Sequence, residues 1–298
     1  REAFLAGRQS PAFFGSAINN FGVREILNTL VELAPSPGSR KALQREVSPA
    51  ENKFSAVVFK IQANMDPAHR DRVAFLRICS GHFQRGMKLK ICRNGKEVRT
   101  NNALSFLSQR RDILDEAFPG DIIGLPNHGL LRLGDTLTEG EQLQFTGLPF
   151  FAPEIFRMVE SADPLRSKQL RTGLMQLGEE GAIQVFRPMT GGTMLLGAFG
   201  QLQFEVVSHR LQTEYGAEVR LLPARYNLAR WVSSDDPVAL KKFIQENIHR
   251  MAEDVVGASV FLASHKSELD VAQQRWESIQ FHALREHAGL IYQSDLAG

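Results

Sequence analysis

The chain has 298 residues, of which 43% are hydrophobic, and its formal net charge at pH 7 is only +2. This length and composition predict a soluble globular protein with two domains and part of a third. No apolar run approaches the roughly 18 residues that span a bilayer, and the first ten residues lack the apolar core of a secretory signal. The sequence therefore excludes a membrane partner and predicts a cytoplasmic protein.

The first predicted unit, within residues 1–37, is a strand, a tight turn and a helix. Ala12-Phe13-Phe14 is an apolar run with strand character, and Gly15-Ser16-Ala17 is a turn of small residues. Because the chain begins with Arg1 rather than Met, and its first recognisable unit already looks like the end of a larger unit, the chain is expected to be a piece of a longer protein. The apolar residues that define the helix face are Val23, Ile26, Leu27, Leu30 and Val31.

Two changes of pattern mark boundaries after this unit. The segment Ala34-Pro-Ser-Pro-Gly38 ends the helix, because Pro and Gly cannot continue it, and the polar residues 38–53 indicate a linker. Near Gly147, runs with a period of two residues give way to helix-like i, i+3, i+4 spacing. We therefore predict a β-barrel domain over residues 54–147 and an α+β domain over residues 148–298.

The predicted barrel contains six or more short apolar runs, separated by Gly, Pro and Asn. In one run, GMKLKI, Lys88 and Lys90 alternate with apolar residues, so both lysines should point away from the core. Asn94-Gly95, which follows, is the preferred pair of a type I′ hairpin turn. So many short strands predict a small closed barrel, an architecture without exposed edge strands.

Strands and helices alternate in the C-terminal segment. A strand at residues 154–159, a helix over residues 164–177, two strands, a helix over residues 201–215 and a last strand give the order βαββαβ. Gly216 is expected to end the second of these helices. A second set of alternating strands and helices follows, with helices over residues 236–251 and 268–276. We therefore predict an α+β domain of two ferredoxin-like lobes. The residues of the 201–215 helix expected to face the core are Leu202, Phe204, Val207 and Leu211.

Positive charge is concentrated in the barrel segment. Residues 54–147 carry 13 Lys/Arg and 10 Asp/Glu, whereas residues 148–298 carry 15 and 18. Within residues 82–111 there are eight basic residues and one acidic residue. A phosphate-backbone partner and a merely solvated barrel face explain this cluster equally well. The candidate RNA contacts are Lys88, Lys90, Lys96, Arg99, Arg110 and Arg111, with Arg70 and Arg72 in a mixed-charge loop that could equally be self-paired.

No catalytic or metal-binding motif is found in the chain. It matches no P-loop, dinucleotide fingerprint, nucleophile elbow or zinc-protease motif, and its eight histidines are scattered. Cys79 and Cys92 lie in strand-like runs without metal-ligand spacing, which predicts reduced thiols. From the residues alone we expect a three-part protein with a basic barrel, no metal site and no visible active site.

Several stretches nevertheless resemble one known family. VVFKIQANMDPAHRDRVAFLRICSG (57–81) and AFPGDIIGL (117–125) resemble the second domain of translational GTPases, in particular of the bacterial release factor 3 family. FFGSAINNFGV (13–23) is similar to that family's guanine-recognition loop and final GTPase helix, and LLGAFGQLQFEVVSHRLQTEYGAEV (195–219) to its C-terminal domain. The resemblance implies the last strand and helix of an α/β GTPase domain, then a β-barrel, then an α+β domain.

The resemblance also implies a function for the whole protein. Members of the family bind the ribosome and use GTP, with Mg²⁺, to promote departure of class I release factors after peptide release. By resemblance, Ser16 and Ala17 lie against the guanine base. The phosphate loop, both switch regions and the NKxD-type element match nothing in this chain. The chain alone is therefore expected to bind no nucleotide cofactor tightly and to hydrolyse no GTP.

Two alternatives share these features. An elongation factor G-like or ribosomal protection GTPase has the same barrel and βαββαβ units, although its extra C-terminal domains have no counterpart after Arg285. A non-enzymatic ribosome- or RNA-binding module is the second. The partners implied are ribosomal RNA and proteins and class I release factors, with no DNA, and residues 289–298 match nothing.

Overall fold

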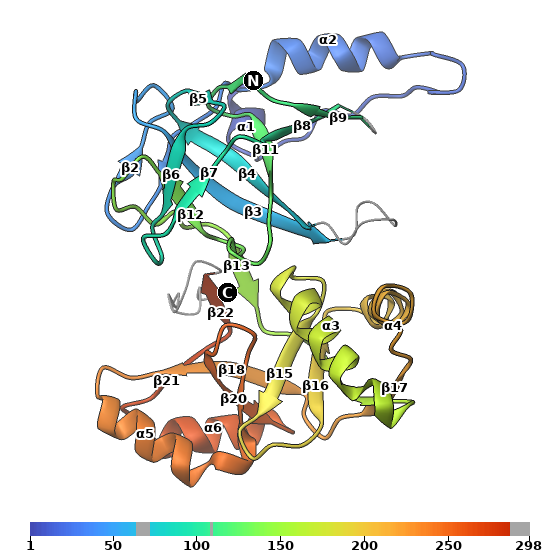
Figure 1. The fold of residues 1–298 in the computed structure, drawn as a ribbon, viewed down its shortest axis with the longest axis vertical. Coiled ribbons are helices and arrows are strands. Elements are labelled where there is room, and N and C mark those ends of the chain that lie inside the picture. Colours follow the sequence, from blue (N-terminus) through green and yellow to red (C-terminus); the bar gives the residue numbers. More distant parts are fainter. Residues whose placement is uncertain (64–71, 108–109, 287–298) are drawn as a thin grey trace.

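The computed structural model describes residues 1–63, 72–107 and 110–286. Figure 1 shows the N-terminal unit and the β-sheet domain at one end of the molecule and the α+β domain at the other. Arg70, one of the candidate RNA contacts, lies outside the described residues. No helix within the described ranges combines the length and apolar character needed to cross a membrane.

The N-terminal unit contains a short helix α1 (Glu2–Leu5) and the longer helix α2 (Val23–Leu33). The strand expected at Ala12–Phe14 is not formed. A strand needs a neighbouring backbone to pair with, and within the described part of the chain this segment has none. Helix α2 forms as expected but buries no residue, and its apolar face stays largely exposed.

The predicted linker folds onto the barrel. Strands β1 (Arg40–Lys41) and β2 (Glu46–Val47) form a small antiparallel pair. Ala42 forms a further bridge to Phe145, next to the end of the barrel segment. Val47 is completely buried beside Phe145 and Leu143. Residues 38–53 therefore contain ordered structure rather than a free connection.

The barrel domain is an eight-stranded antiparallel sheet in the order β7-β6-β12-β3-β4-β11-β8-β9. Its side chains enclose one core, in which Phe54, Leu76, Leu89 and Leu137 are at most 1% exposed. The β-barrel prediction is confirmed in architecture, but the two end strands do not pair with each other in the described residues, so the sheet is open rather than closed. The strands are β3 (Ser55–Ala63), β4 (Arg72–Ser80), β6 (Lys88–Ile91), β7 (Glu97–Arg99), β8 (Leu104–Leu107), β9 (Arg110–Ile113), β11 (Ile122–Pro126) and β12 (Thr136–Thr138), with β5 (Phe83–Gln84) and β10 (Glu116–Ala117) as a separate pair.

The hairpin between β6 and β7 differs from its prediction. A type I′ turn needs two consecutive residues with positive φ, but only Gly95 has one, at +69°. Ile91 donates to the Lys96 carbonyl at 2.9 Å, which leaves a four-residue loop between them. Asn94 instead uses its side-chain oxygen to accept the N–H of Lys96 at 3.1 Å. The type I′ assignment was therefore wrong, although the hairpin itself forms.

The C-terminal domain consists of two lobes with the same strand order, and this confirms the ferredoxin-like prediction. In each lobe the fourth strand pairs with the first, the first with the third, and the third with the second. Pairing of β15 with β19 joins both lobes into one eight-stranded sheet. The first lobe is β14 (Ile155–Ser161), α3 (Ser167–Glu179), β15 (Gln184–Pro188), β16 (Met194–Ala198), α4 (Gln201–Tyr215) and β17 (Val219–Pro223). The second is β18 (Leu228–Ser233), α5 (Pro237–Glu246), β19 (Met251–Glu253), β20 (Ser259–Ala263), α6 (Lys266–Arg275) and β21 (Gln280–His282).

Separate cores lie under the helix pair of each lobe. A third core, which includes Trp231, lies on the remaining face of the joined sheet and packs against Phe150. Phe150 belongs to β13 (Pro149–Phe151), which pairs with β22 (Leu284–Glu286) between the two domains (Figure 1). The sheet of the barrel and the sheet of the C-terminal domain are thus separate.

Three details of the predicted helices needed correction. The helix expected over residues 164–177 begins with a 3₁₀ turn (Pro164–Arg166), and α3 extends from Ser167 to Glu179. Leu202 is 69% exposed, because it lies about 200° around the helix from the buried Phe204. Helix α5 ends at Glu246 rather than Met251, which begins β19, and a single 3₁₀ turn fills the interval. In contrast, α4 has the predicted bounds, and Gly216, at φ +63°, ends it in the left-handed conformation.

Candidate functional site

The Ser16–Ala17 loop is a narrow turn held by its own backbone. Ser16 and Phe21 exchange two N–H···O bonds, of 2.9 and 3.0 Å. The limbs approach so closely that a Cβ on Gly15 or on Gly22 would lie 2.7 Å from a carbonyl oxygen of the facing limb. Two glycines in the sequence therefore fix the shape of this loop.

The tip of the loop presents an unused donor. Ala17 is exposed, and its backbone N–H donates no hydrogen bond within the described residues. The Ser16 hydroxyl accepts the N–H of Asn19 at 3.4 Å. This exposed amide is free to donate a hydrogen bond to an acceptor outside the described residues. In the described ranges no group of three or more His, Cys, Asp or Glu residues could hold a metal ion.

The basic strip of the barrel consists of Lys88, Lys90, Lys96 and Arg99 on β6, β7 and the loop between them. All four side chains are exposed, and none makes an ion pair in the part of the chain that the structure describes. The β6–β7 register places Lys88 directly opposite Arg99, and Lys90 opposite Glu97. Like charges in directly opposed positions destabilise a strand pair. A bound anion would relieve the repulsion between Lys88 and Arg99.

Other basic residues of the cluster are paired within the barrel. Arg93 Nε lies 2.7 Å from the buried Asp135, and this hydrogen bond raises the pKa of Arg93. Arg85 Nε lies 3.3 Å from Asp115. These two pairs reduce the free positive charge of the cluster, whereas Arg110 and Arg111, which lie in β9, stay predicted RNA contacts.

Arg72 lies at the interface between the two domains, not on the basic strip. Its side chain is only 14% exposed, and its Nη2 is 3.4 Å from Glu179 at the end of α3. Its Nε is 4.0 Å from Glu180, whose side chain is 3% exposed and also pairs with Arg210 at 3.0 Å. Burial raises the pKa of Glu180, against the opposing effect of Arg210. The position of Arg72 fits a link between domains better than a contact with RNA phosphates.

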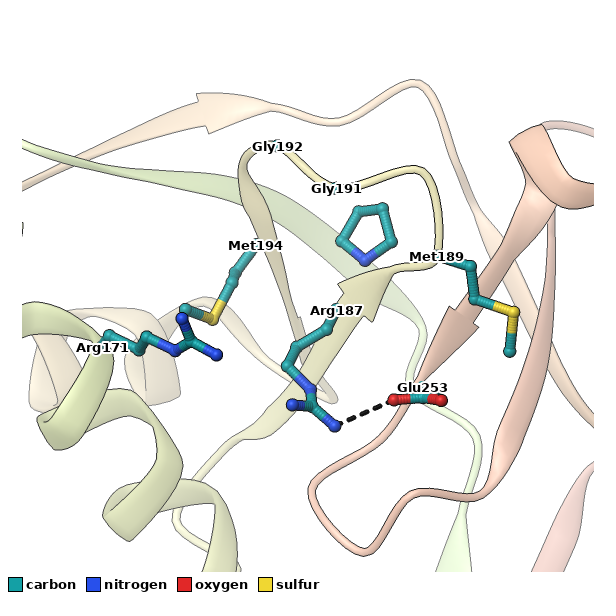
Figure 2. Close-up of a pocket in the computed structure, with 8 residues that line it drawn as sticks. Arg171, Arg187, Met189, Gly191, Gly192, Met194 and Glu253 are labelled. Atoms are coloured by element: carbon teal, nitrogen blue, oxygen red, sulfur yellow. Dashed lines mark hydrogen bonds and ion pairs between the residues drawn. The ribbon is translucent and has the colours of Figure 1, made fainter.

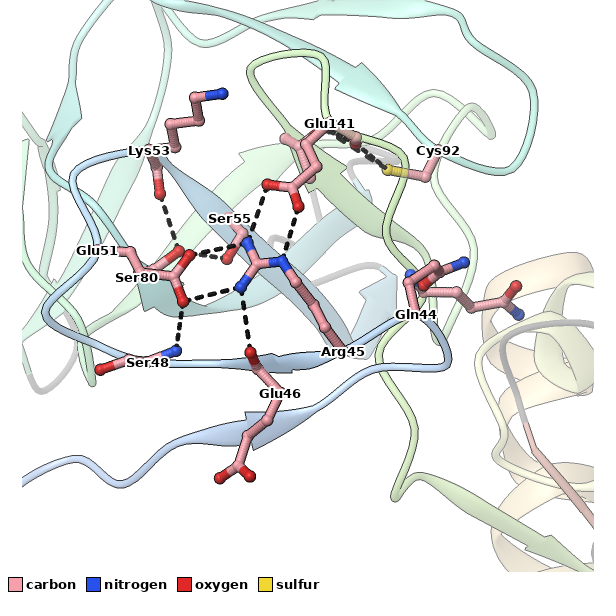
Figure 3. Close-up of polar contacts among 12 residues, drawn as sticks. Gln44, Arg45, Glu46, Ser48, Glu51, Lys53, Ser55, Ser80, Cys92 and Glu141 are labelled. Atoms are coloured by element: carbon pink, nitrogen blue, oxygen red, sulfur yellow. Dashed lines mark hydrogen bonds and ion pairs between the residues drawn. The ribbon is translucent and has the colours of Figure 1, made fainter.

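A second link, which sequence reasoning missed, attaches the linker to the barrel. Figure 3 shows Arg45 between two carboxylates, with bonds of 2.8 and 2.9 Å to Glu51 and of 2.8 and 3.0 Å to Glu141. These hydrogen bonds lower the pKa of both carboxyls. Glu51 also accepts the backbone N–H of Ser48 at 2.7 Å. Glu141 is 96 residues from Arg45 in the sequence, so no local sequence pattern predicts this ion pair.

The two domains match two family models. Residues 145–273 match the C-terminal domain of class II release factor RF3, and residues 53–140 match elongation factor G domain 2. A solved structure from Thermus thermophilus superposes with a TM-score of 0.60 at 24% identity, over 79% of this chain and 34% of that one, which supports the fold alone.

Curated relatives named peptide chain release factor 3 are similar over almost all of the chain. The protein of Nitrosomonas europaea is 68% identical over 98% of this chain, and that of Bordetella pertussis is 66% identical over 98%. The chain spans 55% of the length of each of these two relatives. The C-terminal match separates the chain from the elongation factor G alternative. The matches of the two domains to the family models, together with these sequence identities, show that the chain belongs to the peptide chain release factor 3 family.

Proposed function

We propose that the protein acts in translation termination, where it binds the ribosome and promotes dissociation of class I release factors after peptide release. Membership of the release factor 3 family supports this role. The observation in the chain itself that favours ribosome binding is the basic strip, whose charges have no ion-pair partner among the described residues, above all Lys88 opposite Arg99. Such side chains neutralise RNA phosphates and position a protein without reading base sequence.

GTP with Mg²⁺ is the cofactor that we propose for the whole protein. When bound, it would supply the free energy of phosphoryl transfer. Within this chain, the Ser16–Ala17 loop would contact the base through the exposed N–H of Ala17. The chain alone should show no GTP turnover and no micromolar GDP binding by calorimetry. Measurable GTP turnover, or micromolar GDP binding, by the chain alone would contradict this assignment of the nucleotide contacts.

A dissociation assay tests the termination role. Post-termination ribosomes carry a fluorescent class I release factor, and the full-length gene product is added with GTP or GDP. We expect GTP-dependent acceleration of release factor departure. Acceleration of tRNA translocation without release factor departure would instead support an elongation factor G-like role and refute the proposal.

A further inference from the structure

A cavity of about 540 Å³ opens on the C-terminal domain between α3, β19 and the turn that connects β15 with β16. Figure 2 shows two guanidinium groups along it, those of Arg171 from α3 and Arg187 from β15, with Glu253 of β19 beside Arg187. Gly191 and Gly192 of the turn form another side. The cavity lies in the C-terminal domain, whereas the basic strip lies on β6 and β7 of the barrel domain, at the other end of the molecule (Figure 1).

Both arginines have unused hydrogen-bond donors. Arg187 donates to Glu253 at 2.9 Å through Nη2, while its buried Nε has no partner within the described residues. Arg171 is exposed and makes no ion pair or hydrogen bond in the same part of the chain. The lining therefore carries two positive charges and one negative charge, with several N–H groups left to donate.

The glycine turn adds main-chain donors. Gly191 and Gly192 both have positive φ, +78° and +96°, and a Cβ at either position would meet no atom within 4 Å. The backbone N–H groups of Gly192 and Thr193 donate no hydrogen bond within the described ranges. N–H groups left free in a turn can donate hydrogen bonds to a bound anion.

We propose that this cavity binds a phosphate group. A tetrahedral phosphate has enough acceptor oxygens to take bonds from two guanidinium forks and from main-chain N–H groups at once. The cavity is also large enough to hold a sugar next to the phosphate. The phosphate could belong to an RNA backbone or to a free nucleotide, and the test below separates these sources. The proposal does not depend on the termination function.

The position of Glu253 predicts how substitutions in the cavity should change phosphate affinity. Its carboxylate repels an anion and occupies one donor of Arg187. The substitution Glu253→Gln should therefore tighten phosphate binding, whereas Arg171→Gln should weaken it roughly ten- to hundredfold, the range of a charge-assisted hydrogen bond. Arg171 is suited to the test because its exposed side chain contributes little to folding. Arg220→Gln, an exposed arginine of β17 outside the cavity, is the matched control.

Isothermal titration calorimetry at low salt tests the proposal with three probes: inorganic phosphate, AMP and a short single-stranded RNA without terminal phosphates. We expect saturable binding that is weakened in Arg171→Gln, tightened in Glu253→Gln and unchanged in Arg220→Gln. If the component that Arg171→Gln weakens is tighter for AMP, the cavity takes a free nucleotide; if it is tighter for RNA, the cavity takes a phosphodiester backbone. The proposal would be overturned if no probe showed saturable binding, or if Arg171→Gln and the parent bound the probes with equal affinity.

Discussion

The substitution Asp254→Asn should strongly destabilise the C-terminal domain. Asp254 and Arg285 form a buried ion pair, 2.9 Å from Nη2 to Oδ2, with side chains 3% and 1% exposed. The same carboxylate accepts Trp231 Nε1 at 3.0 Å and the backbone N–H groups of Val256 and Ala258 at 3.0 and 2.9 Å. An asparagine has only one acceptor oxygen, so in either orientation its NH₂ group would face other donors. The variant would also remove the negative charge that pairs with the buried guanidinium of Arg285.

Removing one partner of a buried pair costs about 3–5 kcal/mol. With an m-value of about 2 kcal/mol/M in urea, the unfolding midpoint should fall by about 2 M. The chain has two tryptophans, Trp231 and Trp276, and both lie in the second lobe, so their fluorescence reports unfolding of this domain. Asp235→Asn, the same change at an exposed position of this lobe, should shift the midpoint little. A midpoint for Asp254→Asn within about 0.3 M of the parent would refute the reasoning.

Three further predictions concern the barrel. Gly81→Ala should cost well over 1 kcal/mol, because φ is +73° and the new Cβ would lie 2.5 Å from the backbone N of Phe54. Gly95→Ala, at φ +69° but in open space, should lower the free energy of unfolding by only about 1 kcal/mol. Equal losses of unfolding free energy for the two variants, measured in urea, would contradict the steric explanation for Gly81. Burial raises the pKa of Cys79 to about 11, so little thiolate exists at neutral pH, and iodoacetamide should label Cys92 first, as followed by peptide mass spectrometry. The raised pKa also predicts stability that is complete below about pH 9 and is lost as the pH rises toward 11, a loss that Cys79→Ser should reduce.

The sequence predicted a secondary-structure element well where residues within that element determine its bounds or its buried face. Helix α4 has its predicted bounds because its apolar spacing and the terminal Gly216 both act locally. The core-facing Leu89 and Ile91 follow from alternation along a single strand. The sequence did not predict that the barrel sheet stays open, because closure of the sheet depends on pairing between strands that are distant in the sequence.

Contacts across the chain explain why the candidate site was only partly predictable. The sequence shows Arg72 beside other charges, but its partner Glu179 is 107 residues away. Sequence alternation placed Lys88 and Lys90 on the surface, yet only the register shows that Lys88 lies opposite Arg99 while Lys90 lies opposite Glu97. The arginines of the phosphate cavity come from α3 and β15 and share no sequence motif.

The most direct test of ribosome binding through the basic strip is a salt titration of 70S ribosome affinity for the parent chain and for Lys88→Gln/Arg99→Gln. If these two side chains neutralise RNA phosphates, the double variant should bind more weakly, and its plot of log affinity against log salt should be less steep by roughly 1.4 to 1.8 units. The control Arg220→Gln/Lys241→Gln removes two exposed charges from the C-terminal domain and should leave both quantities unchanged. Equal affinity and equal slope for the parent and Lys88→Gln/Arg99→Gln would contradict the account.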